Sequence, residues 1–257
     1  MITFDAESRI FYLENEQITY AFAVPEGRSP EHLFFGPRCG RDLTTGSYSQ
    51  NGLAHQIIRK DASGFAYNPT RVPQEIHTAL GGDFGEPTVL LGDAAGNRRF
   101  DLSFSAFRIL PVKPALPGLP SLRGGETLEL ILTGRGVTIT LLYTLFEDCG
   151  VLARSLSVRN TGEAPLSVRK AFSFAFSLPV GSYKAVSLWG AAGSEGQLQS
   201  QPLSSFGLFG VDSRRGFSSA IHNPFLALAE ETATEDRGMV WGPTSSGPVL
   251  SPCTRSG

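Results

Sequence analysis

Between residues 127 and 178 the chain alternates apolar and polar residues through four successive segments that short turns connect. In the first segment, Leu128, Leu130 and Leu132 alternate with threonine and glutamate residues. The segments "VTITLLYTLF", "VLARSLSVRN" and "LSVRKAFSFAFSL" continue the alternation, with "GRG", "EDCG" and "NTGEAP" between them. A period of two places the apolar side chains of a strand on one face. These segments therefore predict an antiparallel meander that packs one face against a second sheet.

The rest of the chain carries shorter signals of the same kind. Residues 9–24 and 87–110 each contain two apolar runs around a polar turn, a pattern typical of a β-hairpin. Residues 111–120, "PVKPALPGLP", hold four prolines and cannot pair within a central strand, so we expect an extended connector there. The 29 glycines and 17 prolines suit many short strands joined by tight turns. We predict an all-β protein, a large antiparallel β-sandwich of many short strands.

The charge distribution and the cysteines limit which binding partners and which cellular compartment we expect. The 22 basic and 24 acidic residues are well mixed, and no basic stripe indicates nucleic acid or a membrane surface as a partner. Cys39, Cys149 and Cys253 lie far apart with no CxxC spacing, which favours a reducing compartment. The first residues, "MITFDAESRI", carry charges where a signal peptide has an apolar run. We therefore expect a cytoplasmic protein that binds neither nucleic acid nor a membrane.

Motifs for metals and cofactors do not stand out. The four histidines show no HxH or HExxH spacing, so we expect no metal site. "GAAGSEG" (190–196) spaces its glycines somewhat like a phosphate loop, but it lacks GxGxxG and no βαβ pattern follows. We interpret it as a loop and expect no cofactor.

One stretch carries groups that could do chemistry. "PQEIHTALGGDFGEP" (73–87) places Glu75, His77, Asp83 and Glu86 in a glycine-rich region. Two carboxylates and an imidazole could perform acid–base work on a sugar. The alternative is a hydrogen-bonded turn in which Asp83 caps its own backbone, and the residues alone favour that turn.

The same stretch begins a series of recognisable motifs. "QEIHTALGGDFGEP" resembles the QExPxxGxGDFRxP segment of glycoside hydrolase family 36, the bacterial and fungal α-galactosidases. The resemblance continues in the family's order through "FRILPVKPALPGLP" (107–120), "LLYTLFEDCGVLARSLSVRN" (141–160) and "SRRGFSSAIHNPFLAL" (213–228). "GMVWG" (238–242) is similar to the start of a further family segment. The resemblance covers residues 1–242 and implies the family's N-terminal β-supersandwich domain.

The resemblance implies an activity whose chemistry lies outside these residues. Family members are retaining glycosidases that remove terminal α-galactose from sugars such as melibiose and raffinose, with an aspartate nucleophile and an aspartate acid/base. Both aspartates belong to a following (β/α)₈ barrel, which no segment here matches. We therefore expect no catalytic residue in this chain, and whether it counts as an enzyme stays open. Its implied roles are folding, oligomerisation and support of the substrate pocket, with no activity alone.

The resemblance also implies a homo-oligomer in which a loop of this domain reaches a neighbouring subunit's pocket. The loop after "RDL" (41–43) is the candidate. Asn51, or less directly Asp61, would be its polar contact with an α-galactoside or oligosaccharide. A plain surface loop is the alternative.

Three positions differ from the family motifs in ways that affect which sugar we expect the protein to bind. Ala220 stands where the family usually has His, Gly85 where Arg is common, and Phe107 replaces a His. Polar and aromatic groups are the kinds that hold sugars. The departures imply either a different sugar or a copy that is decaying.

Two other functions stay open from the residues. One is a free-standing carbohydrate-binding β-sandwich, although no exposed row of Trp or Tyr provides a stacking platform. The other is a sugar mutarotase, because supersandwich folds also host enzymes that use a His and a Glu. Glu75 and His77 would be the pair, since residues i and i+2 of an extended segment share a face.

The last residues, 243–257, break the pattern of the rest. They hold three prolines, a lone cysteine and no apolar period. Codons can be chosen for "PTSSGPVLS" that, read from the third base, encode "NLVWSGSF", which is similar to the family segment expected after "GMVW". We therefore expect a frameshift near codon 243 and an out-of-frame tail, with the domain ending at residue 242.

Overall fold

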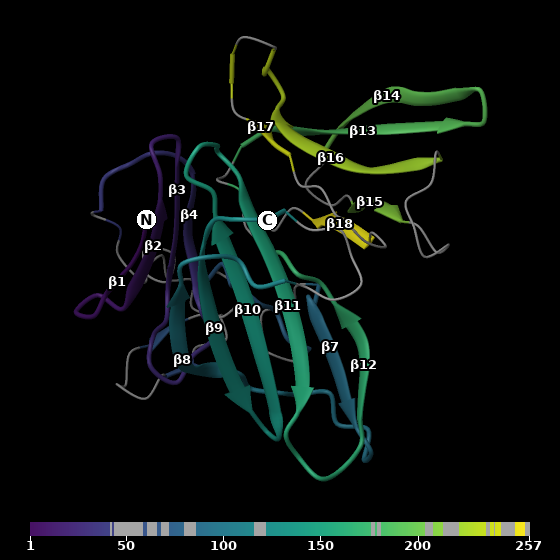
Figure 1. Cartoon of the computed structure of the whole chain (residues 1–257). Coiled ribbons are helices and arrows are strands. Elements are labelled where there is room, and N and C mark those ends of the chain that lie inside the picture. Colours follow the sequence, from purple (N-terminus) through teal and green to yellow (C-terminus); the bar gives the residue numbers. More distant parts are fainter. Residues whose placement is uncertain are drawn as a thin grey trace. The chain divides into compact units, whose positions relative to one another are not determined.

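A computed structural model describes residues 1–41, 43, 59–60, 66–67, 72–79, 86–115, 122–175, 178, 181–203, 208–212, 221–234, 237–238, 240–242 and 250–254. Every regular element in these ranges is a β-strand, as the alternation predicts (Figure 1). The chain divides into two compact units, the first Met1–Ala115 with Leu122–Ser177 and the second Leu116–Ser121 with Leu178–Gly257. Among the described residues, no helix is long and apolar enough to cross a lipid bilayer.

In the described part of the first unit there are two four-stranded antiparallel sheets and two smaller ones. One large sheet follows chain order, with β1 (Ile2–Asp5), β2 (Ile10–Glu14), β3 (Ile18–Ala23) and β4 (Glu31–Pro37). The other has the order β11-β10-β9-β8, built from β8 (Ser103–Leu110), β9 (Glu126–Gly134), β10 (Val137–Leu145) and β11 (Leu152–Asn160). The two-stranded sheets pair β7 (Val89–Asp93) with β12 (Leu166–Ala171), and β5 (Arg59–Lys60) with β6 (Ala66–Tyr67).

The predicted meander is confirmed for β9, β10 and β11, and its fourth strand is wrong. Leu141 of β10 lies opposite Leu130 on one side and Leu156 on the other, so the expected faces align. β12 pairs with β7 instead of β11, and β8 takes the place at the other edge. Between β11 and β12, the Asn160 side chain closes a turn by donating to the Ala164 carbonyl at 2.8 Å. The chain thus leaves the sheet after β11.

Of the two predicted hairpins, the first is confirmed and the second is wrong. β2 and β3 pair directly, but β7 and β8 lie in different sheets. A tight turn does follow β7, where the Asp93 carboxylate accepts the Ala95 and Asn97 backbone N–H groups. The chain then continues through Phe100 and Leu102, which are buried in the core before β8 begins. Burial of these two side chains, worth about 1.5–3 kcal/mol each, outweighs local hairpin pairing.

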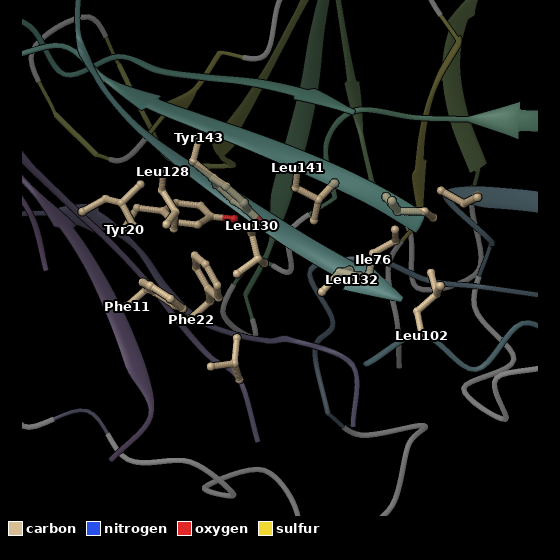
Figure 2. Packing of buried hydrophobic residues seen from close by; sticks show 14 of the residues in the cluster. Phe11, Tyr20, Phe22, Ile76, Leu102, Leu128, Leu130, Leu132, Leu141 and Tyr143 are labelled. Atoms are coloured by element: carbon tan, nitrogen blue, oxygen red, sulfur yellow. The ribbon is translucent and has the colours of Figure 1, made fainter. Parts of the chain in front are cut away.

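One hydrophobic core lies between the two large sheets. Figure 2 shows Phe11, Tyr20 and Phe22 facing Leu130 and Tyr143 across it. The rings of Phe22 and Tyr143 stack with their centroids 5.0 Å apart. Aromatic contacts of this kind add about 0.5–1.5 kcal/mol beyond area burial, so they hold the sheets together.

The second unit is built from shorter pairings. Its four-stranded sheet has the order β14-β13-β16-β17, from β13 (Tyr183–Ala191), β14 (Ser194–Pro202), β16 (His222–Glu230) and β17 (Val240–Trp241). β15 (Leu208–Asp212) pairs with β18 (Leu250–Thr254), so part of the expected out-of-frame tail adopts a strand. The boundary at residue 242 and the frameshift stay predictions.

Candidate functional site

The segment of residues 72–79 bridges strands of the first unit. His32 of β4 donates its backbone N–H to the Pro73 carbonyl at 2.9 Å, and Glu75 donates its own to the Pro30 carbonyl at 3.0 Å. A few residues on, Thr78 forms a parallel bridge with Val89 of β7. The segment is thereby fixed at both ends, and the Glu75 side chain enters the core, where it is 1% exposed.

Four side chains from four strands converge on the Glu75 carboxylate. The Tyr20 hydroxyl of β3 lies 2.8 Å from each carboxylate oxygen. The His32 Nδ1 atom lies 2.8 Å from Oε1. The Tyr143 hydroxyl of β10 and the Arg154 Nη1 atom of β11 reach Oε2 at 2.8 and 2.9 Å. The carboxylate therefore links both large sheets of the sandwich.

Arg154 makes further contacts that fix its position. Its Nη2 atom donates to the Glu75 backbone carbonyl at 2.5 Å, and its Nη1 atom also donates to the Ala175 carbonyl at 3.3 Å. The guanidinium lies over the rings of Tyr143 and Phe174, 4.7 and 5.6 Å from their centroids. These cation–π contacts in a desolvated site stabilise the buried positive charge.

Burial and charge set the protonation states of this cluster. Burial raises the pKa of the Glu75 carboxyl, but the Arg154 charge and the His32 hydrogen bond outweigh burial, and the pKa lies below its ordinary value. Burial raises the pKa of Tyr20 and Tyr143 well above that of an ordinary phenol, and the Glu75 charge raises both further. At neutral pH Glu75 is therefore an anion and both tyrosines are neutral donors. Because an ionised carboxylate only accepts, the His32 Nδ1 atom donates to it.

This arrangement holds the fold together, and it leaves the Glu75 carboxylate inaccessible to a substrate. The Glu75 side chain is inaccessible to solvent, and donors occupy both of its oxygens. A general acid or base must come within hydrogen-bond reach of its substrate, and Glu75 has no such access. We conclude that Glu75 is a structural residue.

The other residues of the acidic stretch do not assemble a site with Glu75. The imidazole that contacts Glu75 belongs to His32, not to His77 as the mutarotase alternative requires. The backbone of His77 pairs with Thr88. Glu86 forms a half-exposed ion pair with Lys170. Asp83 lies outside the described residues.

The structure does not test the predicted substrate contacts. Asn51 and Asp61 both lie outside the described residues, so their roles stay predictions. Among the described residues, no three His, Cys, Asp or Glu side chains lie together as a metal site would need.

A surface hollow of about 180 Å³ has Asp93, Arg135 and Asn160 in its lining. The Asp93 carboxylate in this hollow already accepts hydrogen bonds from Ala95 and Asn97 within its own turn. The Arg135 Nη2 atom forms an ion pair with it, 3.5 Å from Oδ2.

Aromatic side chains suited to sugar stacking are sparse on the described surface. Trp189 is 47% exposed on β13, and Phe225 is 36% exposed on β16. Trp241 is buried, with its ring 6.0 Å from that of Tyr183. Carbohydrate-binding surfaces stack sugar rings on exposed aromatic rings. One half-exposed tryptophan gives the free-standing binding module little support.

Sequence reasoning missed Tyr20, His32, Tyr143 and Arg154, and one signal for them was present. Arg154 lies between Leu152 and Leu156 on the apolar face of its strand. A charge at an inward position needs a buried counter-charge. That requirement points to an acidic partner elsewhere in the chain.

Comparisons with known proteins agree with this fold. The two units together define an all-β domain of the supersandwich class. The chain belongs to the glycosyl hydrolase family 36 N-terminal domain family, whose profile matches residues 28–244. The resemblance seen in the motifs is thereby confirmed.

Individual relatives show how much of a longer protein the chain matches. It is 31% identical over 246 residues to the probable alpha-galactosidase C of Aspergillus flavus, covering 92% of this chain and 31% of that protein. It is 28% identical to alpha-galactosidase 1 of Pediococcus pentosaceus, covering 94% and 34%. The chain therefore spans about a third of the length of these relatives.

Solved structures give the same proportion. The α-galactosidase AgaB of Geobacillus stearothermophilus superposes with a TM-score of 0.89 at 28% identity, over 99% of this chain and 36% of AgaB. A variant of AgaA from the same organism, solved in complex with raffinose, gives a TM-score of 0.85 at 29% identity, over 95% of this chain and 35% of AgaA. The predicted β-supersandwich is confirmed.

Proposed function

We propose that this chain is the N-terminal domain of a retaining α-galactosidase. In this proposal it supports folding, oligomerisation and the substrate pocket, and it has no glycosidase activity alone. One observation carries the proposal: the chain superposes on AgaB along almost its whole length while covering only 36% of AgaB. The buried state of Glu75 supports it, because donors occupy this carboxylate and no substrate can reach it.

The substrate class follows from the relatives. AgaA variants have been solved in complex with raffinose and with stachyose. We infer that the whole protein acts on terminal α-galactosides such as melibiose and raffinose. Its cysteines without CxxC spacing support a cytoplasmic location, and its mixed charge supports the lack of nucleic-acid or membrane partners. The homo-oligomer is proposed from membership of the family.

A chimera tests the proposal. Residues 1–242 of this chain replace the matching domain of AgaB, and hydrolysis of an aryl α-galactoside is measured for the chimera and for the 257-residue chain. We expect the chimera to be active and the chain alone to be inactive. A folded but inactive chimera, or hydrolysis by the chain alone, would contradict the proposal.

The same chimera tests the predicted substrate loop. Asn51→Ala and Asp61→Ala are compared with the unchanged chimera in KM and kcat. A loop that contacts the sugar predicts a raised KM for the Asn51→Ala variant, because a lost polar contact weakens binding. Unchanged constants in both variants would favour a plain surface loop.

A further inference from the structure

Turns at one end of the first unit line the surface hollow described above (Figure 1). They are the turn that begins at Asp93 after β7, the turn between β9 and β10, and the turn between β11 and β12. Gly136 joins the last two, because its carbonyl accepts the Thr161 and Gly162 N–H groups at 2.8 and 2.9 Å. These contacts form the walls of the hollow without a ligand, which lowers the cost of binding one.

Arg135, in the turn between β9 and β10, has a left-handed backbone conformation. Gly134 pairs with Val137, so Arg135 and Gly136 are the two central residues of the turn, with φ angles of 43° and 73°. Hairpin turns with positive φ at both central residues favour Asn followed by Gly. An arginine at the first position strains the backbone, because its Cβ atom crowds the following carbonyl. Strain of this kind concentrates at functional positions, so we attribute the arginine to its side chain and not to the turn.

The Arg135 side chain lines the hollow and is 53% exposed. Its guanidinium lies 3.5 Å from the Asp93 carboxylate and 3.5 Å from the Arg99 carbonyl. Both contacts are longer than an ordinary N–H···O bond of about 2.9 Å, and a guanidinium has five N–H donors, so donors remain for a ligand. Glu163, in the turn between β11 and β12, adds an exposed carboxylate that accepts. The hollow therefore offers both donors and acceptors.

The charges and the size of the hollow favour a small neutral ligand with hydroxyl groups. Its charged lining residues are one guanidinium and the carboxylates of Asp93 and Glu163, so the carboxylates repel an anion and the guanidinium repels a metal ion. A hydroxyl group both donates and accepts, and it can bond to Arg135 or to Glu163. Pro165 and Leu166 add apolar surface for C–H groups. The volume of about 180 Å³ is below the roughly 300–1,000 Å³ of pockets for drug-sized ligands, and it suits a single sugar ring.

We propose that this hollow binds one pyranose ring of a saccharide, with Arg135 donating to its hydroxyl oxygens and Glu163 accepting from its hydroxyl groups. Phe100, the aromatic residue of the lining, is 2% exposed and offers no ring for stacking. We therefore expect a Kd of about 1 mM or weaker. This site rests on the hollow itself and not on α-galactosidase activity.

Titration of the isotope-labelled 257-residue chain with galactose, followed by nuclear magnetic resonance, tests the site. The backbone amide signals of Gly136 and Gly162 should shift and saturate, and inorganic phosphate should leave them in place. Arg135→Asn should weaken galactose binding about tenfold or more, because it removes the charged donor. Its melting temperature should equal or exceed that of the parent, because Asn suits the left-handed position. Arg99→Asn is the matched control and should bind like the parent, because Arg99 is also half-exposed but pairs with Asp101 outside the lining.

The direction of the stability change separates a ligand site from a structural role. If Arg135 served only the fold, Arg135→Asn would lower the melting temperature and leave galactose binding unchanged. Galactose that shifts neither glycine signal, phosphate that shifts them in its place, or Arg135→Asn that binds galactose like the parent would overturn the site. An active AgaB chimera would then still support the proposed function, since hydrolysis by the chimera does not depend on this hollow.

Discussion

The Arg154 guanidinium contacts both the side-chain carboxylate and the backbone carbonyl of Glu75. Its Nη1 atom lies 2.9 Å from Glu75 Oε2, and its Nη2 atom lies 2.5 Å from the Glu75 carbonyl oxygen. The two residues are 79 positions apart, so the pair ties the segment 72–79 to β11. Glu75, a candidate for acid–base chemistry in the sequence, therefore stabilises the fold.

Removing the charge of Glu75 should destabilise the chain strongly. Glu75→Gln leaves the Arg154 guanidinium in the core without its counter-charge. Breaking a buried pair in this way costs about 3–5 kcal/mol of unfolding free energy. Urea unfolding followed by circular dichroism measures the loss.

Glu86→Gln is the matched control for that measurement. Its ion pair with Lys170 is half-exposed, and such pairs contribute about 1 kcal/mol or less. If Glu75→Gln unfolds at the same urea concentration as Glu86→Gln, the buried pair does not stabilise the fold and the account of the site is wrong.

Acid should weaken the fold through Glu75. Its pKa is lowered in the folded state, so its contribution is fully present above the unfolded value of about 4.3 and is lost as the pH falls from there through the lower folded value. Unfolding free energies measured at a series of pH values should therefore converge for the parent and Glu75→Gln below about pH 4.3. Parallel curves through that range would contradict the lowered pKa.

Tyr20 and Tyr143 should ionise only when the protein unfolds. Their pKa values lie well above 10.0, so the stability they contribute is present below the pKa of an unfolded tyrosine and is lost as the pH rises beyond it. A titration of phenolate absorbance should show a late step that coincides with loss of circular dichroism. Tyr143→Phe should reduce the amplitude of that step and cost about 1–3 kcal/mol, because Glu75 loses a donor. A late step of full amplitude in this variant would be inconsistent with the burial of Tyr143.

Gly134 marks a close approach of two backbone segments. A Cβ atom there would lie 2.1 Å from the Asp101 carbonyl oxygen, which is too close without a backbone shift. We expect Gly134→Ala to lower the melting temperature by several degrees, as a loss of about 1–3 kcal/mol would. Gly242→Ala provides the comparison, because a Cβ atom at that position would meet nothing within 4 Å beyond its chain neighbours. Equal melting temperatures for the two variants would refute the close approach.

Local pattern was enough to predict much of the fold. The alternation of Leu128, Leu130 and Leu132 places them in the core, where each is 0% exposed. β12 was misplaced because its own alternation does not specify a partner strand. The second hairpin was wrong because Phe100 and Leu102 gain more from the core than from a local turn.

The buried cluster around Glu75 could not be predicted from local sequence pattern. Tyr20 and Glu75 are 55 positions apart, and Glu75 and Arg154 are 79 apart. Only the packing of the two sheets brings these residues together, and a period-two pattern does not define that packing. Glu75 therefore looked like a catalytic candidate beside His77, while its actual partner, His32, lies on another strand.

Sequencing the gene across codons 235–260 and onward tests the central claim most directly, since the claim is that this chain is the N-terminal part of an α-galactosidase. The account predicts that a shifted frame opens near codon 243 and continues into a (β/α)₈ barrel with two catalytic aspartates, over about 250 codons or more. Downstream DNA that encodes no barrel in any frame would contradict the account and would favour a free-standing sandwich.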